Sequence, residues 1–281
     1  MIRFDAYSAT TEAAKATDLV QLVADSLGGL AGSSWSIKQG KGFHQFSDRI
    51  AFTSDDGGEF ASVMWGGRHG DRVMLEAKGE HTPAVVERLR SAYPHRCTRV
   101  DSCADFDAPR AFERLYRSCR QVKTAHRIIG GKAGDWEDFP EKGRTLYLGS
   151  KSSVARTRLY EKGKQPEYAH LNRPDWTRLE VQVRPAKDAK SEFSTLGPLE
   201  VWGASRWTRD LAAAALQNHV DPHPAGTTYR LSSRDAALGW MCRQYGPHLM
   251  SLADDLGGWD VLGLTLREMV ADQQRQARQG R

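Results

Sequence analysis

Residues 144–165 read RTLYLGSKSSVARTRLYEKGKQ, and this stretch decides the fold of the chain. A turn rich in glycine and serine at 149–153 separates two short runs, which predicts a β-hairpin. A phenol held between cations is favoured to ionise, because positive charge stabilises the phenolate. In the second run, strand alternation places four polar side chains on one face: Arg156, Arg158, Tyr160 and Lys162.

The hairpin by itself is open to two interpretations. An ionised tyrosine beside phosphate-binding cations is able to attack a phosphodiester. The same pattern is also typical of a tyrosine on a sheet surface with solvated basic neighbours.

Composition indicates a globular protein. The chain has 281 residues, of which 40% are hydrophobic and 27% charged. No apolar run approaches the roughly 18 residues of a membrane helix, and the N-terminus lacks the apolar segment of a signal peptide. The 4 cysteines are scattered and form no metal motif. We therefore expect a cytoplasmic protein with no membrane partner and no disulfides.

Positive charge is concentrated in the middle of the chain. The whole sequence carries a net charge of +5, whereas residues 110–190 hold 19 lysines and arginines and 10 aspartates and glutamates, a net charge of +9. A basic segment of this kind favours a polyanionic partner such as nucleic acid. A solvated basic surface is the alternative interpretation.

The pattern of elements predicts an α+β fold with a largely antiparallel central sheet flanked by helices, and a small C-terminal helical region. A composition change places a boundary near residue 195, giving parts 1–195 and 196–281. Expected strands are 2–9, 97–107 and 176–184, with a β-meander over 42–80 and a loop over 130–140. Expected helices are Thr11–Leu27, 83–93, 109–124, 198–217, 232–250 and 259–278.

Asp101, Glu180 and Glu76 are carboxylates in the middle of expected strands, where acidic residues are depleted. Asp101 shares a strand face with Arg99, and Glu180 stands between two arginines on its own face. Glu76 is a third, in the meander. Asp101 is satisfied equally well by Arg99 or by a hard divalent cation, which takes oxygen ligands. Glu180 fits a cross-strand ion pair, a metal ligand or a general base.

These residues together describe a possible site for metal-assisted phosphoryl transfer. A divalent cation would polarise the phosphate, Tyr160 would attack in line, and Arg158 and Lys162 would stabilise the developing charge. The hypothesis requires that the strands bearing Asp101, Glu180 and Tyr160 adjoin, which spacing does not establish.

Four motifs in this order resemble the replication initiation factor (Rep_trans) family. That family comprises rolling-circle initiators of plasmids and filamentous phages, and related relaxases. The likeness covers roughly residues 1–250. The motifs are R-x-D-x-x-x-D at Arg99, Asp101 and Asp105; Y-x-G-S-K-x-S at 147–153; Y-E-K-G at 160–163; and R-x-E at Arg178 and Glu180.

The resemblance implies a metal-dependent, site-specific single-strand DNA endonuclease and strand transferase. Tyr160 would nick one strand at an origin, form a 5′-phosphotyrosine, free a 3′ hydroxyl as primer, and later religate; Tyr147 is the second candidate nucleophile. The expected catalytic residues are Tyr160, Arg158 and Lys162. Mg²⁺ or Mn²⁺ is expected at Asp101, Glu180 and Glu76. The expected DNA contacts are Lys151, Arg156, Arg178, Arg184 and Lys164.

The resemblance also implies partners: origin DNA, single-stranded or supercoiled, a second protomer, and a host helicase and polymerase. Two other functions stay open. A mobilisation relaxase would use the same chemistry in conjugative transfer, and a non-catalytic regulator would use the fold only to bind DNA.

Overall fold

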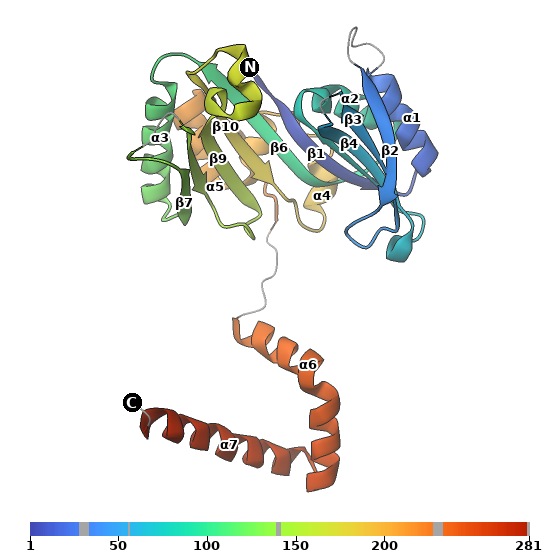
Figure 1. Ribbon diagram of the computed structural model, residues 1–281, viewed down its shortest axis with the longest axis vertical. Helices are drawn as coiled ribbons and strands as arrows, with labels where there is room; N and C mark the ends of the chain where they lie inside the picture. The colour runs from blue at the N-terminus through green and yellow to red at the C-terminus, as the bar shows by residue number, and fades with distance from the viewer. Residues whose placement is uncertain (28–33, 56, 139–141, 227–232, 280–281) are drawn as a thin grey trace. The chain divides into compact units, whose positions relative to one another are not determined.

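The computed structural model describes residues 1–27, 34–55, 57–138, 142–226 and 233–279. Two compact units, Met1–Thr228 and Tyr229–Arg281, make up the chain. Figure 1 shows a broad sheet in the first and a pair of helices in the second. Within the described ranges, every helix is too short or too polar to cross a membrane.

A ten-stranded sheet with antiparallel pairing throughout forms the first unit, which confirms the predicted α+β fold. Its order is β2-β3-β4-β5-β1-β6-β10-β9-β8-β7. The strands are β1 (Ile2–Thr11), β2 (Trp35–Lys41), β3 (Asp48–Ser54), β4 (Glu59–Trp65), β5 (Val73–Lys78), β6 (Arg96–Asp107), β7 (Gly130–Gly134), β8 (Arg144–Leu148), β9 (Ala155–Glu161) and β10 (Trp176–Val183).

The sheet consists of two halves with the same topology. Read outward from the centre, one half runs β1, β5, β4, β3, β2 and the other runs β6, β10, β9, β8, β7. Each half starts with its central strand and continues into a helix, α1 (Ala16–Leu27) after β1 and α3 (Ala111–Ala125) after β6. The antiparallel pair of β1 and β6 joins the halves. Helices α1 and α3 therefore occupy equivalent places.

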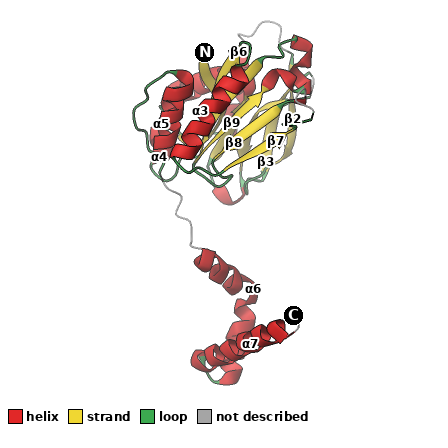
Figure 2. Ribbon diagram, turned by 90° about the vertical axis from the view of Figure 1, so that its left-hand side faces the viewer, coloured by secondary structure: helices red, strands yellow, loops and turns green. Residues whose placement is uncertain are grey.

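Helices α1, α2 (Thr82–Ala92) and α3 pack on one face of the sheet. Figure 2 shows α3 lying across the strands of its half, and it contacts β8, β9 and β10. Phe112, Leu115 and Val122 recur at helical spacing and bury one side of α3. They join a core with alternate strand residues such as Leu159 and Val181. Strand alternation directs the intervening polar residues to the opposite face.

Residues after 195 belong to this core. The short helix α4 (Ala189–Glu192) ends before the expected boundary, and the residues beyond it form η6 (Glu200–Ala204), α5 (Arg206–Leu211) and η7 (Ala212–Leu216). Trp202 is fully buried, and its Nε1 donates to Ser102 Oγ at 3.1 Å. The compact unit therefore continues past the boundary expected near 195 and ends at Thr228.

Several element boundaries differ from those expected. The first helix begins at Ala16, because Thr11 is still in β1, where its Oγ1 donates to the Pro94 carbonyl at 2.7 Å. The expected loop 130–140 contains β7. One helix expected over 198–217 is interrupted, because Ser205 caps a new helix at its N-terminus. The Gly28-Gly29 end expected for the first helix lies outside the described residues.

The second unit consists of α6 (Ser233–Leu256) and α7 (Trp259–Gln279). Gly257 and Gly258 join them with positive φ angles of 88° and 142°, a conformation that favours glycine. Ala253 and Leu262 are buried in this unit. The two helices expected over 232–250 and 259–278 are therefore present, with the first extended to Leu256.

Replacing Trp202 tests whether the segment after 195 is part of the core. Trp202→Ala should lower the free energy of unfolding by ~3–5 kcal/mol, because it removes a fully buried indole. Urea unfolding followed by circular dichroism measures the change. Trp259→Ala in α7, whose side chain is 57% exposed, is the control and should change it by less than about 0.5 kcal/mol. Equal losses would contradict this assignment.

Candidate functional site

Strand pairing brings the predicted residues into neighbouring rows on the face opposite α1, α2 and α3. Strands β6, β10, β9 and β8 lie side by side in that order. The rows are Asp101, Gln182 and Arg156; then Cys103, Glu180, Arg158 and Tyr147; then Asp105, Arg178 and Tyr160. The strands bearing Asp101, Glu180 and Tyr160 therefore adjoin.

A pocket of about 850 Å³ opens above these rows. Tyr160, Arg158, Asp101 and Glu180 all line it, as does Lys162 from the loop after β9. Residues 78–81, between β5 and α2, line it from the other half of the sheet. The pocket thus brings phenols, carboxylates and cations together, the predicted Tyr160, Asp101 and Glu180 among them.

Tyr160 lies deep in this pocket and is 4% exposed. The Arg158 guanidinium stacks on its ring, 4.2 Å from the centroid. Burial raises the pKa of Tyr160 above its ordinary value, and the negative charge of Glu180 raises it further, while Arg158 opposes both. The phenol is therefore protonated at neutral pH. The expectation that neighbouring cations would ionise it is wrong for the chain alone, because burial outweighs them.

Tyr147 has a similar but shallower environment. Its side chain is half-buried, and the Arg156 guanidinium lies 4.2 Å from its ring centroid. It lines the same pocket. Each tyrosine therefore has its own stacked arginine, and Tyr147 is the more accessible of the two.

The carboxylates of Asp101 and Glu180 are each bound by an arginine. Asp101 accepts from Arg99 Nε at 2.9 Å and from Gln182 Nε2 at 3.1 Å. Glu180 accepts from Arg158 Nη2 at 3.0 Å. Burial raises the pKa of Glu180 to about 7; Arg158 opposes the rise and the charge of Asp101 adds to it. The two carboxylates therefore lie in neighbouring rows and influence each other electrostatically, and each is paired with an arginine.

These two carboxylates fit a hard divalent cation, which takes oxygen ligands and would relieve their mutual repulsion. Glu76 does not join them. It accepts from Ser8 Oγ at 3.1 Å and does not line the pocket, because β5 pairs with β1 and not with β6. Among the residues that the structure describes, no three of His, Cys, Asp and Glu are grouped as metal ligands. The expected three-carboxylate set is therefore not assembled.

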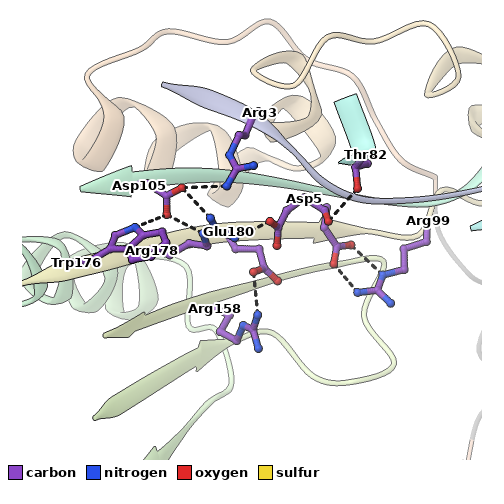
Figure 3. Close-up of polar contacts among 10 residues, drawn as sticks. Arg3, Asp5, Thr82, Arg99, Asp105, Arg158, Trp176, Arg178 and Glu180 are labelled. Carbon is purple, nitrogen blue, oxygen red and sulfur yellow. Dashed lines mark hydrogen bonds and ion pairs between the residues drawn. The ribbon is translucent and has the colours of Figure 1, made fainter. Parts of the chain in front are cut away.

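Arg178 is a buried charge of the site, with a side chain that is 2% exposed. Figure 3 shows its contacts with the neighbouring carboxylates. Its Nε and Nη2 donate to the two oxygens of Asp105, each at 2.7 Å, and its Nη1 donates to Asp5 at 2.5 Å. Trp176 Nε1 also donates to Asp105, at 2.9 Å. Carboxylates therefore hold three of the five N–H groups of this buried guanidinium. The phosphate contact expected of Arg178 stays a prediction, and it would compete with these bonds.

Lys162 is enclosed by aromatic rings. Its Nζ lies 4.3 Å from the Tyr168 centroid and 4.5 Å from the Trp176 centroid. Burial lowers the pKa of Lys162 to about 8, and Arg178 lowers it as well. The ammonium is therefore charged at neutral pH but releases its proton more readily than an exposed lysine.

The other expected DNA contacts do not all lie on the surface that holds Tyr160. Arg156 lines the pocket, and Lys151 is exposed on the β8–β9 turn. Arg184 is exposed just after β10. Lys164 instead forms an ion pair with Glu161 at 2.9 Å and lines a different pocket, beside α3. Lys164 is therefore not part of the surface that holds Tyr160.

Sequence reasoning missed Asp5, Tyr168 and Trp176. Asp5 is an acidic residue within a strand, the signal that identified Asp101, and it sits at a register shift between Phe4 and Ala6. The rings around Lys162 come from the 3₁₀ helix Pro166–Leu171 and from β10, and no sequence pattern indicates that the two approach each other.

The profile of a family described as replication initiation factor matches residues 96–242, which run from β6 into α6. No curated protein matches the chain. A solved structure of a rolling circle replication initiator protein from Geobacillus stearothermophilus is similar, with a TM-score of 0.46 and 17% identity, covering 72% of this chain and 83% of that one.

Removing the Arg178 charge should destabilise the protein strongly. Arg178→Met leaves Asp5 and Asp105 without their buried partner, and we expect a loss of ~3–5 kcal/mol in the free energy of unfolding. Urea unfolding at pH 7 measures this. Arg156→Met, which removes an arginine stacked on a half-buried ring, should cost less than about 1 kcal/mol. A loss for Arg178→Met no larger than this control would refute the role given to Arg178.

Proposed function

The chain belongs to the replication initiation factor family, and we propose that it initiates rolling-circle replication by nicking one strand of its origin through a tyrosine. One observation carries this proposal: Tyr160 shares a pocket with the cations Arg158 and Lys162 and the carboxylates Asp101 and Glu180. Phosphodiester transfer needs these three kinds of group, a nucleophile, positive charge for the phosphate and acidic residues.

In this mechanism the phenol oxygen of Tyr160 attacks the scissile phosphorus. The new O–P bond forms as the bond from phosphorus to the 3′ oxygen breaks, leaving a 5′-phosphotyrosine and a free 3′ hydroxyl. One proton leaves the phenol and one reaches the 3′ oxygen, so the step balances. Religation is the reverse reaction.

Proton movement falls to Glu180 and Lys162. Glu180, whose pKa of about 7 makes it a competent base at neutral pH, influences Tyr160 electrostatically and is our candidate acceptor for the phenol proton. Lys162, with a pKa of about 8, is our candidate donor to the leaving 3′ oxygen. Arg158 and Arg156 would stabilise the charge that develops on the phosphate.

A divalent cation, Mg²⁺ or Mn²⁺, would be held by Asp101 and Glu180. When bound, it supplies a Lewis acid for a phosphate oxygen. Glu180 then acts as a ligand rather than as the base, and the two roles are alternatives for the same carboxylate. Glu76 has no part in this proposal.

The proposed partners follow from the reaction. Single-stranded or supercoiled origin DNA is the substrate, and a host helicase and polymerase would use the freed 3′ end in the cytoplasm. Ending a round needs a second cleavage, which a second protomer would supply in a homodimer. The same chemistry would serve a mobilisation relaxase. A non-catalytic DNA-binding regulator is the third possibility, and retention of the phenol beside two carboxylates argues against it.

Paired tyrosine variants test the nucleophile. With an oligonucleotide carrying the origin and Mn²⁺, Tyr160→Phe should reduce formation of the covalent protein–DNA adduct by roughly 10³-fold or more, while DNA binding is kept. Denaturing gel electrophoresis measures the adduct. Tyr147→Phe is the matched control and should retain most of it. If Tyr147→Phe abolishes the adduct and Tyr160→Phe does not, Tyr147 is the nucleophile. If the wild-type protein forms no adduct at all, the result favours a non-catalytic DNA-binding regulator.

Thermal melting tests the metal site without relying on activity. Mn²⁺ at 100 times its Kd should stabilise the wild-type chain by about 2.7 kcal/mol. Asp101→Asn and Glu180→Gln should each remove most of that gain, because each loses a charged ligand. Glu76→Gln should keep it. If Glu76→Gln also abolishes the gain, the assignment of the two ligands is wrong.

A further inference from the structure

Helix α3 exposes a row of arginines on the helix side of the sheet, opposite the pocket. Arg110, at its N-cap, and Arg114, Arg117 and Arg120 are all exposed. Spacings of three and four residues place neighbouring members on one side of the helix, away from the buried Phe112. At 1.5 Å per residue the row spans about 15 Å. Figure 2 shows α3 on the outside of the first unit.

These arginines have no carboxylate partner among the residues that the structure describes. Of the acids nearby, Glu113 accepts from Arg144 Nη2 at 2.7 Å and Asp210 contacts His126 at 2.7 Å. Asp175 lines a small pocket together with Arg110, but the described residues show no ion pair between them. Arg117 makes a hydrogen bond only to the backbone of Glu113. Closely spaced like charges repel each other within a helix, so the row of arginines destabilises α3.

The fold itself does not require this charge, because α1 occupies the equivalent place in the other half of the sheet. Within 16–27, α1 carries Asp18 and Asp25 and no lysine or arginine. Within 111–125, α3 carries four cations and a single acid, Glu113. Two helices with the same topological role thus differ in the sign of their charge. The difference points to a ligand of α3 that α1 does not share.

The chemistry of the face favours the phosphates of a duplex over the bases of a single strand. Proteins that hold single strands stack bases on exposed aromatic rings. The two rings of α3 are engaged internally: Phe112 is buried, and Tyr116 stacks on Phe112 and packs against Trp136. What α3 offers is a line of guanidiniums, which matches the closely spaced phosphates of duplex DNA.

We infer that the exposed face of α3, formed by Arg110, Arg114, Arg117 and Arg120, binds the phosphate backbone of double-stranded DNA. The inference rests on the proposed function, since it assigns the duplex beside the nick to this face. The same strands, β8, β9 and β10, contact α3 on one side and line the pocket on the other. The chain would then hold a single strand and its adjoining duplex on opposite faces of one sheet.

Salt dependence of binding tests the inference. The probe is a 20-base-pair duplex without the nick site, and the variant is Arg114→Gln/Arg117→Gln/Arg120→Gln. Loss of three phosphate contacts should reduce the slope of log K against log salt by about 2–3 and weaken binding roughly 100-fold at 0.15 M salt. Fluorescence anisotropy measures both. Adduct formation on a single-stranded oligonucleotide should be unchanged.

The control removes equal charge from the other half of the sheet. Lys38→Gln/Lys41→Gln/Arg68→Gln changes three exposed cations outside the pocket and should leave the slope within about 1 of wild type. Circular dichroism and melting temperature establish that both variants are folded. An unchanged slope in the α3 variant overturns the inference. An equal loss of slope in both variants also overturns the inference, because it would reflect the net charge of the protein alone.

Two further outcomes separate this inference from the proposed function. A wild-type chain that binds the duplex through α3 but forms no adduct keeps the inference and refutes nicking. If the wild-type chain forms the adduct but the α3 variant binds duplex with an unchanged salt-dependence slope, nicking is supported and the inference about α3 is refuted. If the variant loses affinity for polyglutamate but not for duplex, the face serves an acidic protein and the inference is wrong.

Discussion

The site depends on one buried ion-pair network, in which Arg178 binds Asp5 and Asp105. These residues come from β10, β1 and β6, so the network ties together the strands at the junction of the two halves. A buried guanidinium tolerates no missing partner, and a slip of one residue in any strand would turn these side chains to the opposite face. The network thereby fixes the register that places Tyr160 beside Arg178 and Glu180 beside Arg158.

That register also gives the pocket its electrostatic balance. Arg99 binds Asp101 and Arg158 binds Glu180, so two acids and two bases neutralise each other on one surface. In the proposed reaction, a phosphate would replace the carboxylates as partner of the arginines, and a divalent cation would replace the arginines as partner of the carboxylates. Such an exchange would transfer guanidiniums to phosphate oxygens and carboxylates to metal, with little change in the total charge buried.

Much of this architecture could be predicted from the sequence, for particular reasons. Alternation in 155–161 and 176–183 correctly separated the polar face from the apolar one, because each strand has one face in the core. The edge strands β2 and β7 were not predicted, because they contain glycine and lysine and most of their residues are exposed. The partners of Arg178 and Glu76 could not be predicted, for another reason. Which carboxylate approaches which cation depends on strand order, and β1 separates β5 from β6.

The two outer strands have a consequence for the behaviour of the protein in solution. An unpaired strand edge is a template for addition of another chain, and such edges promote aggregation unless they are blunted. Here β2 exposes Lys38, Gly40 and Lys41, and β7 is the five-residue segment GGKAG. Lysine adds charge that resists desolvation, and glycine weakens extended pairing. A sheet this wide is thereby protected at both borders against growing into intermolecular fibrils.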